Sequence, residues 1–152
     1  MWERLRRFRA LDGQAQGTFL RAMLALPLVS QSLRWRGLRA TQKSLQRRQA
    51  PGGKPTKFEK EKLEVTVRML KAAVRHSPGQ PSCLEESLTL WWLLARQGIS
   101  SEVRIGIRKQ AENFEAHAWV ERDGMALNEP EAKHRHYAAF ESEFPPAAGE
   151  KP

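Results

Sequence analysis

A short stretch of the chain, Ser-Cys-Leu-Glu-Glu-Ser at positions 82–87, contains the only cysteine. Ser82 is a favourable N-cap, and Glu85 three positions later completes a capping box, so Cys83 is predicted to be the first residue of a helix. The unpaired N–H groups and the dipole of a helix N-terminus favour a thiolate. Because Glu85 and Glu86 oppose that effect, a reactive Cys83 requires a cationic partner.

His117 is the candidate partner. In the segment Glu-Ala-His-Ala-Trp-Val, small apolar residues alternate with His117 and Trp119, which predicts a strand with the imidazole on the face away from the apolar side chains. A cysteine at a helix N-terminus and a histidine on a strand behind it are the arrangement of cysteine hydrolases, in which a third polar group orients the ring. The alternative is that Cys83 is a small, inert core residue.

The elements that position these residues can be predicted from periodicity and breakers. Apolar residues at helical spacing predict two helices between residues 14 and 48, separated near Pro27–Ser30. The Pro- and Gly-rich segment 49–56 is a predicted loop. Helical spacing returns over 57–75, where Thr56 and Glu59 form a helix start signal, and over 82–97.

The pattern changes after Gly98. Alternating apolar residues predict strands over 103–108 and 114–121, and Asp123-Gly124 predicts a two-residue hairpin into a strand over 125–128. Helices followed by a small antiparallel sheet indicate an α+β fold. We expect residues 1–50 to form a basic helical arm and residues 51–152 a catalytic core within one compact domain, with a frayed tail over 141–152.

Composition narrows the classes of function. A single cysteine excludes an intrachain disulfide, and no apolar run reaches the length of a membrane span, so we expect a cytoplasmic protein. The net charge of +9 resides in residues 1–50, where 11 Lys and Arg stand against two acidic residues. This surplus favours an acidic partner, which could be a peptide, a protein, a nucleic acid or a membrane surface.

Four blocks of sequence together resemble a known family. In the order Cys83–Gly98, Val103–Arg108, Phe114–Val120 and Asp123–Glu129, they are similar to the catalytic half of the lasso peptide biosynthesis B protein, a transglutaminase-like leader peptidase. The resemblance covers about residues 57–130. It implies a papain/transglutaminase-like core and a cysteine protease, with no cofactor, that cuts a ribosomally made precursor peptide between leader and core.

The resemblance also implies roles and partners. Cys83 would attack the scissile carbonyl, and His117 would take and return the proton. An acid after the hairpin would orient His117. A small recognition protein would hold the leader, and a separate ATP-dependent cyclase would use the freed amine. The family usually has Asp where this chain has Glu129. Strict hairpin pairing instead places Asn128 on the face of His117, unless a bulge turns Glu129 round.

Two other functions are compatible with the residues. A transglutaminase or amidase would use the same Cys83 and His117 but pass the acyl group to an amine. A non-catalytic module could bind nucleic acid through residues 1–50, although we expect no nucleic acid partner. His134 and His136 lack further ligands of a metal site, so no metal is expected. Trp91 and Trp92 are interpreted as packing residues, and Gln80 is a candidate for the second oxyanion donor.

Overall fold

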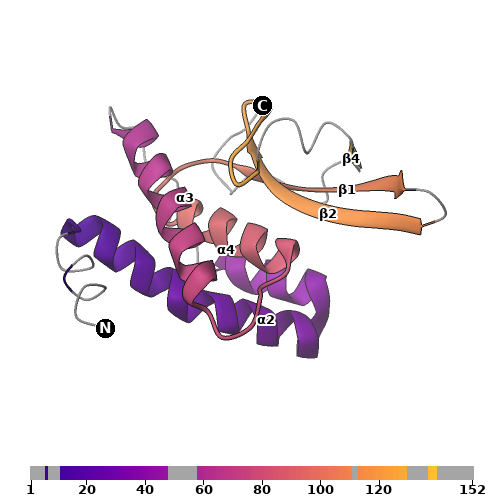
Figure 1. The fold of residues 1–152 in the computed structure, drawn as a ribbon, viewed down its shortest axis with the longest axis horizontal. Coiled ribbons are helices and arrows are strands. Elements are labelled where there is room, and N and C mark those ends of the chain that lie inside the picture. Colours follow the sequence, from indigo (N-terminus) through magenta and orange to yellow (C-terminus); the bar gives the residue numbers. More distant parts are fainter. Residues whose placement is uncertain (1–5, 7–10, 48–57, 111–112, 130–136, 140–152) are drawn as a thin grey trace.

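The structure is a computed structural model that describes residues 6, 11–47, 58–110, 113–129 and 137–139. Three helices form one layer, and a small antiparallel sheet lies against them, with the ends of its two long strands reaching beyond the helices (Figure 1). This arrangement confirms the predicted α+β class. The loop over 49–56, the tail over 141–152 and the helix start signal at Thr56 lie outside the described residues.

The first long helix differs from its prediction. Helix α2, Gly13–Arg47, continues through Pro27, so the separation predicted near Pro27–Ser30 is wrong. Proline removes one backbone N–H from a helix, and Pro27 lies on an exposed face, where water can bond the freed carbonyl. The break occurs at Gly37, whose φ of 73° and ψ of 177° suit glycine alone. Residues 38–47 therefore turn back against the preceding segment.

The next two helices were predicted correctly in type and place. Helix α3 spans Glu59–His76, and helix α4 spans Cys83–Ala95 with Ser82 as its N-cap. Acidic residues in the first turn of α3 and basic residues in its last turn complement the helix dipole. Within the described part of the chain, no helix is both long enough and apolar enough to span a membrane.

The sheet has the strand order β3-β2-β1-β4. Its bounds are Glu102–Gln110 for β1, Asn113–Arg122 for β2, Met125–Ala126 for β3 and Ala138–Ala139 for β4. Asp123 and Gly124 both have positive φ, at 51° and 75°, as a type I′ hairpin turn requires. The hairpin prediction is confirmed, but β3 is shorter than predicted and β4 was not foreseen.

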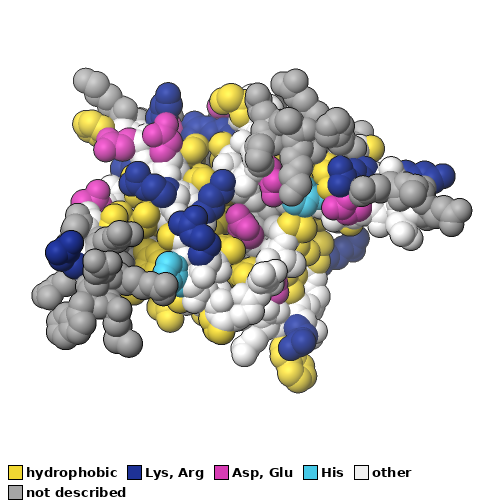
Figure 2. Space-filling model, viewed as in Figure 1, with side chains coloured by type: hydrophobic (Ala, Val, Ile, Leu, Met, Phe, Trp, Pro, Cys, Tyr) yellow, Lys and Arg dark blue, Asp and Glu magenta, His cyan; other side chains and the backbone are white. Residues whose placement is uncertain are grey.

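The hydrophobic core lies where α4 passes between the other helices and the sheet. Trp91 is fully buried, and its Nε1 donates to the carbonyl oxygen of Ser101 at 3.1 Å, so the interpretation of this residue as a packing residue is confirmed. Trp92 is partly buried, with the Arg96 guanidinium 5.2 Å from its ring centroid. On the face shown in Figure 2, basic and acidic side chains are mixed over the helices. The core thus holds α4 rigidly beneath β2.

Candidate active site

The N-terminus of α4 carries Cys83 in the predicted capping box. The Ser82 N–H donates to Oε2 of Glu85 at 2.6 Å, and the Glu85 N–H donates to Oγ of Ser82 at 3.3 Å. Burial acts to raise the pKa of Glu85, but hydrogen bonds from Ser30 and Ser82 lower it below its ordinary value overall. Glu85 therefore ties this helix start to α2, while Cys83 remains half-buried as a free thiol.

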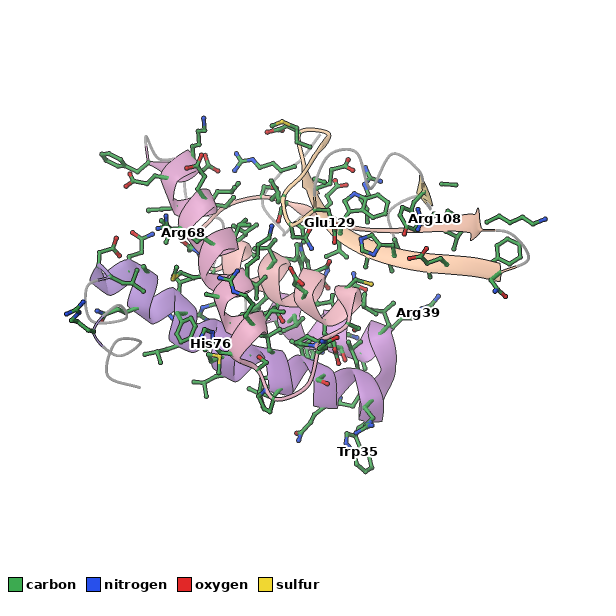
Figure 3. The ribbon with its side chains drawn as sticks, viewed as in Figure 1. Trp35, Arg39, Arg68, His76, Arg108 and Glu129 are labelled. Carbon is green, nitrogen blue, oxygen red and sulfur yellow. The ribbon has the colours of Figure 1, made fainter. Side chains whose placement is uncertain are left out.

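His117 lies in the buried half of β2, where it pairs across the sheet with Gly106. Only 8% of the residue is exposed. Its Nε2 lies 3.2 Å from Oε1 of Glu129, the distance of an ion pair when the imidazole is protonated. Nε2 makes no hydrogen bond of good geometry among the described residues, which is common for catalytic contacts before substrate binds. Glu129 lies beside β2, between the sheet and the helices (Figure 3).

Asn128 has a different position from the one that strict hairpin pairing implies. The Leu127 N–H still donates to the carbonyl of Val120 at 2.8 Å, but at the next residue the ladder ends. There the Asn128 side chain accepts from the Val120 N–H at 2.8 Å, and its Nδ2 donates to Oγ of Ser87 at 3.2 Å. This bend directs the Asn128 amide to α4 and leaves Glu129 at the imidazole.

Tyr137, which sequence reasoning missed, covers the face of β2 that carries His117 and Trp119. Its ring centroid lies 5.1 Å from that of His117 and 6.4 Å from that of Trp119, which is itself buried. Arg108 lies over the outer side of Tyr137, 4.9 Å from the ring centroid. No periodic pattern marks Tyr137, because β4 contributes only two residues to the sheet. An aromatic cluster therefore holds the imidazole in place.

Helix α4, which begins at Cys83, packs against β2, which carries His117. The cysteine and the histidine therefore stand on two rigid elements that adjoin each other. Burial raises the pKa of Tyr137 beside His117, a hydrogen bond with Glu115 raises it further, and the Arg108 guanidinium acts in the opposite direction.

Gly106 leaves room for this aromatic cluster because it has no side chain, and a substitution at this position would fill that room. A Cβ at position 106 would lie 2.9 Å from Cβ of Tyr137 and 3.1 Å from the carbonyl oxygen of Ala138, neither of which can rotate away. We expect Gly106→Ala to cost about 1–3 kcal/mol of unfolding free energy and to displace Tyr137 from His117. Thermal unfolding and the fluorescence of the tryptophans would measure both effects.

Gly17→Ala is the matched control for this change. Gly17 lies inside α2 with only Nη1 of Arg21 near its added Cβ, at 3.9 Å, so alanine should stabilise the helix by up to about 1 kcal/mol. Equal stability of Gly106→Ala and the unmodified protein would contradict a closely packed cluster above Gly106.

Glu86, one turn after Cys83, is the second acid near the site. Burial raises its pKa above the ordinary 4.5, and the nearby Glu129 raises it further, while Lys71 acts in the opposite direction. An acid whose pKa is raised on folding favours the folded state when protonated, so this stability is lost as the pH rises above 4.5.

We therefore expect Glu86→Gln to raise the Tm at neutral pH, with a difference that narrows as the pH falls to 4.5, the ordinary value for this carboxyl. Thermal unfolding across this pH range measures the effect. Glu64→Gln, at an exposed position on α3, is the matched control. A Tm lowered by Glu86→Gln at neutral pH would show that the carboxylate stabilises the fold.

The remaining positions singled out from the sequence, Gln80, His134 and His136, add nothing to the geometry of the site within the described residues. Gln80 is exposed ahead of α4, and no contact with another described residue assigns it to an oxyanion site. His134 and His136 lie outside the described residues. Among the residues that are described, no group of three His, Cys, Asp or Glu side chains could hold a metal ion.

Comparison with known proteins gives one match. The family model of the transglutaminase-like superfamily matches residues 24–142, which include α3, α4, the sheet and most of α2. Searches of curated proteins and of solved structures each gave no match. The match spans more than half of the sequence and contains Cys83, His117 and Glu129 in one continuous region. The chain belongs to the transglutaminase-like superfamily.

Proposed function

We propose that this chain is a cysteine endopeptidase with Cys83 as nucleophile, His117 as general base and Glu129 as the residue that orients the imidazole. Members of the superfamily are typically enzymes of the cysteine protease or acyltransferase type. The observation that carries the assignment is the contact of 3.2 Å between His117 and Glu129 beside a helix that begins at Cys83. It supplies two groups of a triad, with the nucleophile on the adjoining helix.

We also assign one imidazole nitrogen to the thiol. Since Nε2 faces Glu129, Nδ1 is the nitrogen that accepts the Cys83 proton. The sulfur then forms a bond to the scissile carbonyl carbon. As that intermediate collapses, the C–N bond breaks and the imidazolium returns its proton to the leaving amine. Water next attacks the thioester, which releases the carboxylate and restores the thiol.

The start of α4 supports the charge that develops on the carbonyl oxygen. The first N–H groups of a helix have no intrahelical acceptor, and the Cys83 N–H is therefore a natural oxyanion donor. The capping box fixes Ser82 and Glu85 through the backbone on both sides of Cys83, so this donor is held in place before substrate binds. Removal of one oxyanion donor typically costs about 10²–10³ in kcat.

The substrate we propose is a lasso peptide precursor, cut between leader and core. Support comes from the resemblance of the blocks at 83–98, 103–108, 114–120 and 123–129 to the lasso leader peptidases. The proposal includes a small recognition protein that presents the leader, a separate ATP-dependent cyclase that consumes the product, and action in the cytoplasm. Residues 1–50 would act as a basic arm and residues 51–152 as the catalytic core.

Mass spectrometry tests the reaction and its class. Candidate precursors encoded beside the gene would be incubated with the protein and its recognition partner, next to the Cys83→Ala variant. Cleavage at one bond by the unmodified protein alone would support the leader peptidase. An intact precursor that carries a new amide would instead support acyl transfer, and cleavage by both proteins would exclude Cys83 as the nucleophile.

A further inference from the structure

A groove lies between the two segments of α2, away from the catalytic residues. Its volume is about 340 Å³, and Trp92 of α4 forms part of its wall. The turn at Gly37 creates it, and the hydroxyl groups of Ser32 and Thr41, 2.8 Å apart, join the two segments across it. The groove is therefore a built feature of the fold.

The lining combines apolar and basic side chains. Leu24 and Leu28, one helical turn apart, line it while 68% and 62% exposed, so the groove presents apolar surface to solvent. Arg21 and Arg36 lie among the lining residues, and an adjoining hollow adds Lys43 and Arg47 next to Arg36. No Asp or Glu lines either hollow in the part of the chain that the structure describes.

We propose that this groove binds a peptide segment that carries both apolar and acidic side chains. Leucine or aromatic side chains of the peptide would cover Leu24 and Leu28, and its carboxylates would pair with the arginines at the rim. A nucleic acid fits less well, because single strands bind through several stacking aromatic rings, whereas Trp92 is the one aromatic residue among the described lining residues and most of the others are aliphatic or hydroxyl side chains.

The position of the groove also defines what part of a substrate could reach it. Trp92 follows Cys83 by nine residues on α4, which corresponds to about 14 Å along the helix axis. An extended peptide needs roughly four residues to cover that distance. If the proposed function holds, the bound segment is an acidic, apolar part of the leader, at least about four residues from the scissile bond.

The chemistry of the groove can be tested without a known substrate. The probe is a short fluorescein-labelled peptide in which leucines alternate with glutamates, and the comparison peptide has lysines in place of the glutamates. Fluorescence anisotropy would measure binding to the Cys83→Ala protein, which rules out turnover. We expect the glutamate peptide to bind and the lysine peptide not to bind, with affinity at least 10-fold lower for Leu28→Asp and for Arg36→Glu.

Arg68→Glu is the matched control, since Arg68 is an exposed arginine on α3 outside both hollows (Figure 3). We expect its affinity to be unchanged. The proposal would be overturned if both peptides bound equally, or if neither bound. It would also be overturned if all three charge-changing variants weakened binding equally, or if a single-stranded oligonucleotide bound more tightly than the glutamate peptide.

A precursor found in the cleavage assay allows the substrate assignment to be tested separately. Its leader, labelled and bound to the Cys83→Ala protein, should show the same 10-fold loss with Leu28→Asp and Arg36→Glu. Cleavage of the precursor with unchanged leader affinity in these variants would overturn the groove proposal alone. Groove-dependent binding of a precursor that is never cleaved would overturn the proposed function alone.

Discussion

Replacement of Cys83 by alanine is expected to reduce peptide cleavage by on the order of 10⁴-fold or more, since no acyl-enzyme can form without the sulfur. The variant should fold normally. Cys83 is half-buried at the first position of α4, and its backbone N–H and the capping box of Ser82 and Glu85 do not require the thiol. Single-turnover cleavage followed by mass spectrometry measures the loss of activity. Thermal unfolding should show that the free energy of unfolding changes by only about 0.5 kcal/mol.

The single thiol makes the control direct. Because Cys83 is the only cysteine, iodoacetamide can add one carbamidomethyl group to sulfur, and the number of groups added reports the modification of this residue. Cleavage should be lost in proportion to the fraction of protein that is alkylated. Bound precursor should slow the alkylation of Cys83. Full activity after complete alkylation would show that the protein acts by another mechanism.

Much of the fold follows from local signals in the sequence. The capping box at Ser82 and Glu85 and the Asp123-Gly124 turn were predictable because each rests on the chemistry of two or three neighbouring residues. Local chemistry could also mislead. Pro27 reads as a helix breaker, yet its ring lies on an exposed helix face, and the break occurs at Gly37, where the positive φ has no signal beyond the glycine itself.

The surroundings of the site depended on contacts between distant segments. Tyr137 reaches His117 from a two-residue strand, and Gly106 leaves room for it from β1. Neither relationship appears in periodicity, because each involves residues at least 11 positions apart that meet only after the sheet has formed. The choice between Asn128 and Glu129 likewise depends on where the β2–β3 ladder ends, which a single sequence does not specify.

That choice has a measurable consequence. We expect Glu129→Gln to lower kcat by about 10²–10⁴-fold, since the amide keeps the approximate shape but cannot stabilise the imidazolium that forms during the reaction. Glu129→Asp should recover part of the activity, because it keeps the charge and matches the side chain usual in the resembling family. The pH profile of kcat/KM and the rate of Cys83 alkylation would separate loss of the charge from a change in fold.

Asn128→Ala should lower the stability of the fold more than the activity, the opposite of Glu129→Gln. It leaves the Val120 N–H and the Ser87 hydroxyl without their partner in a buried place, at a cost of about 1–3 kcal/mol in unfolding free energy. Because the Asn128 amide faces α4 rather than His117, activity per folded molecule should fall far less than in Glu129→Gln. A folded Asn128→Ala protein that lost as much kcat as Glu129→Gln, with a similar change in pH profile, would make Asn128 the orienting residue and reduce Glu129 to a nearby charge.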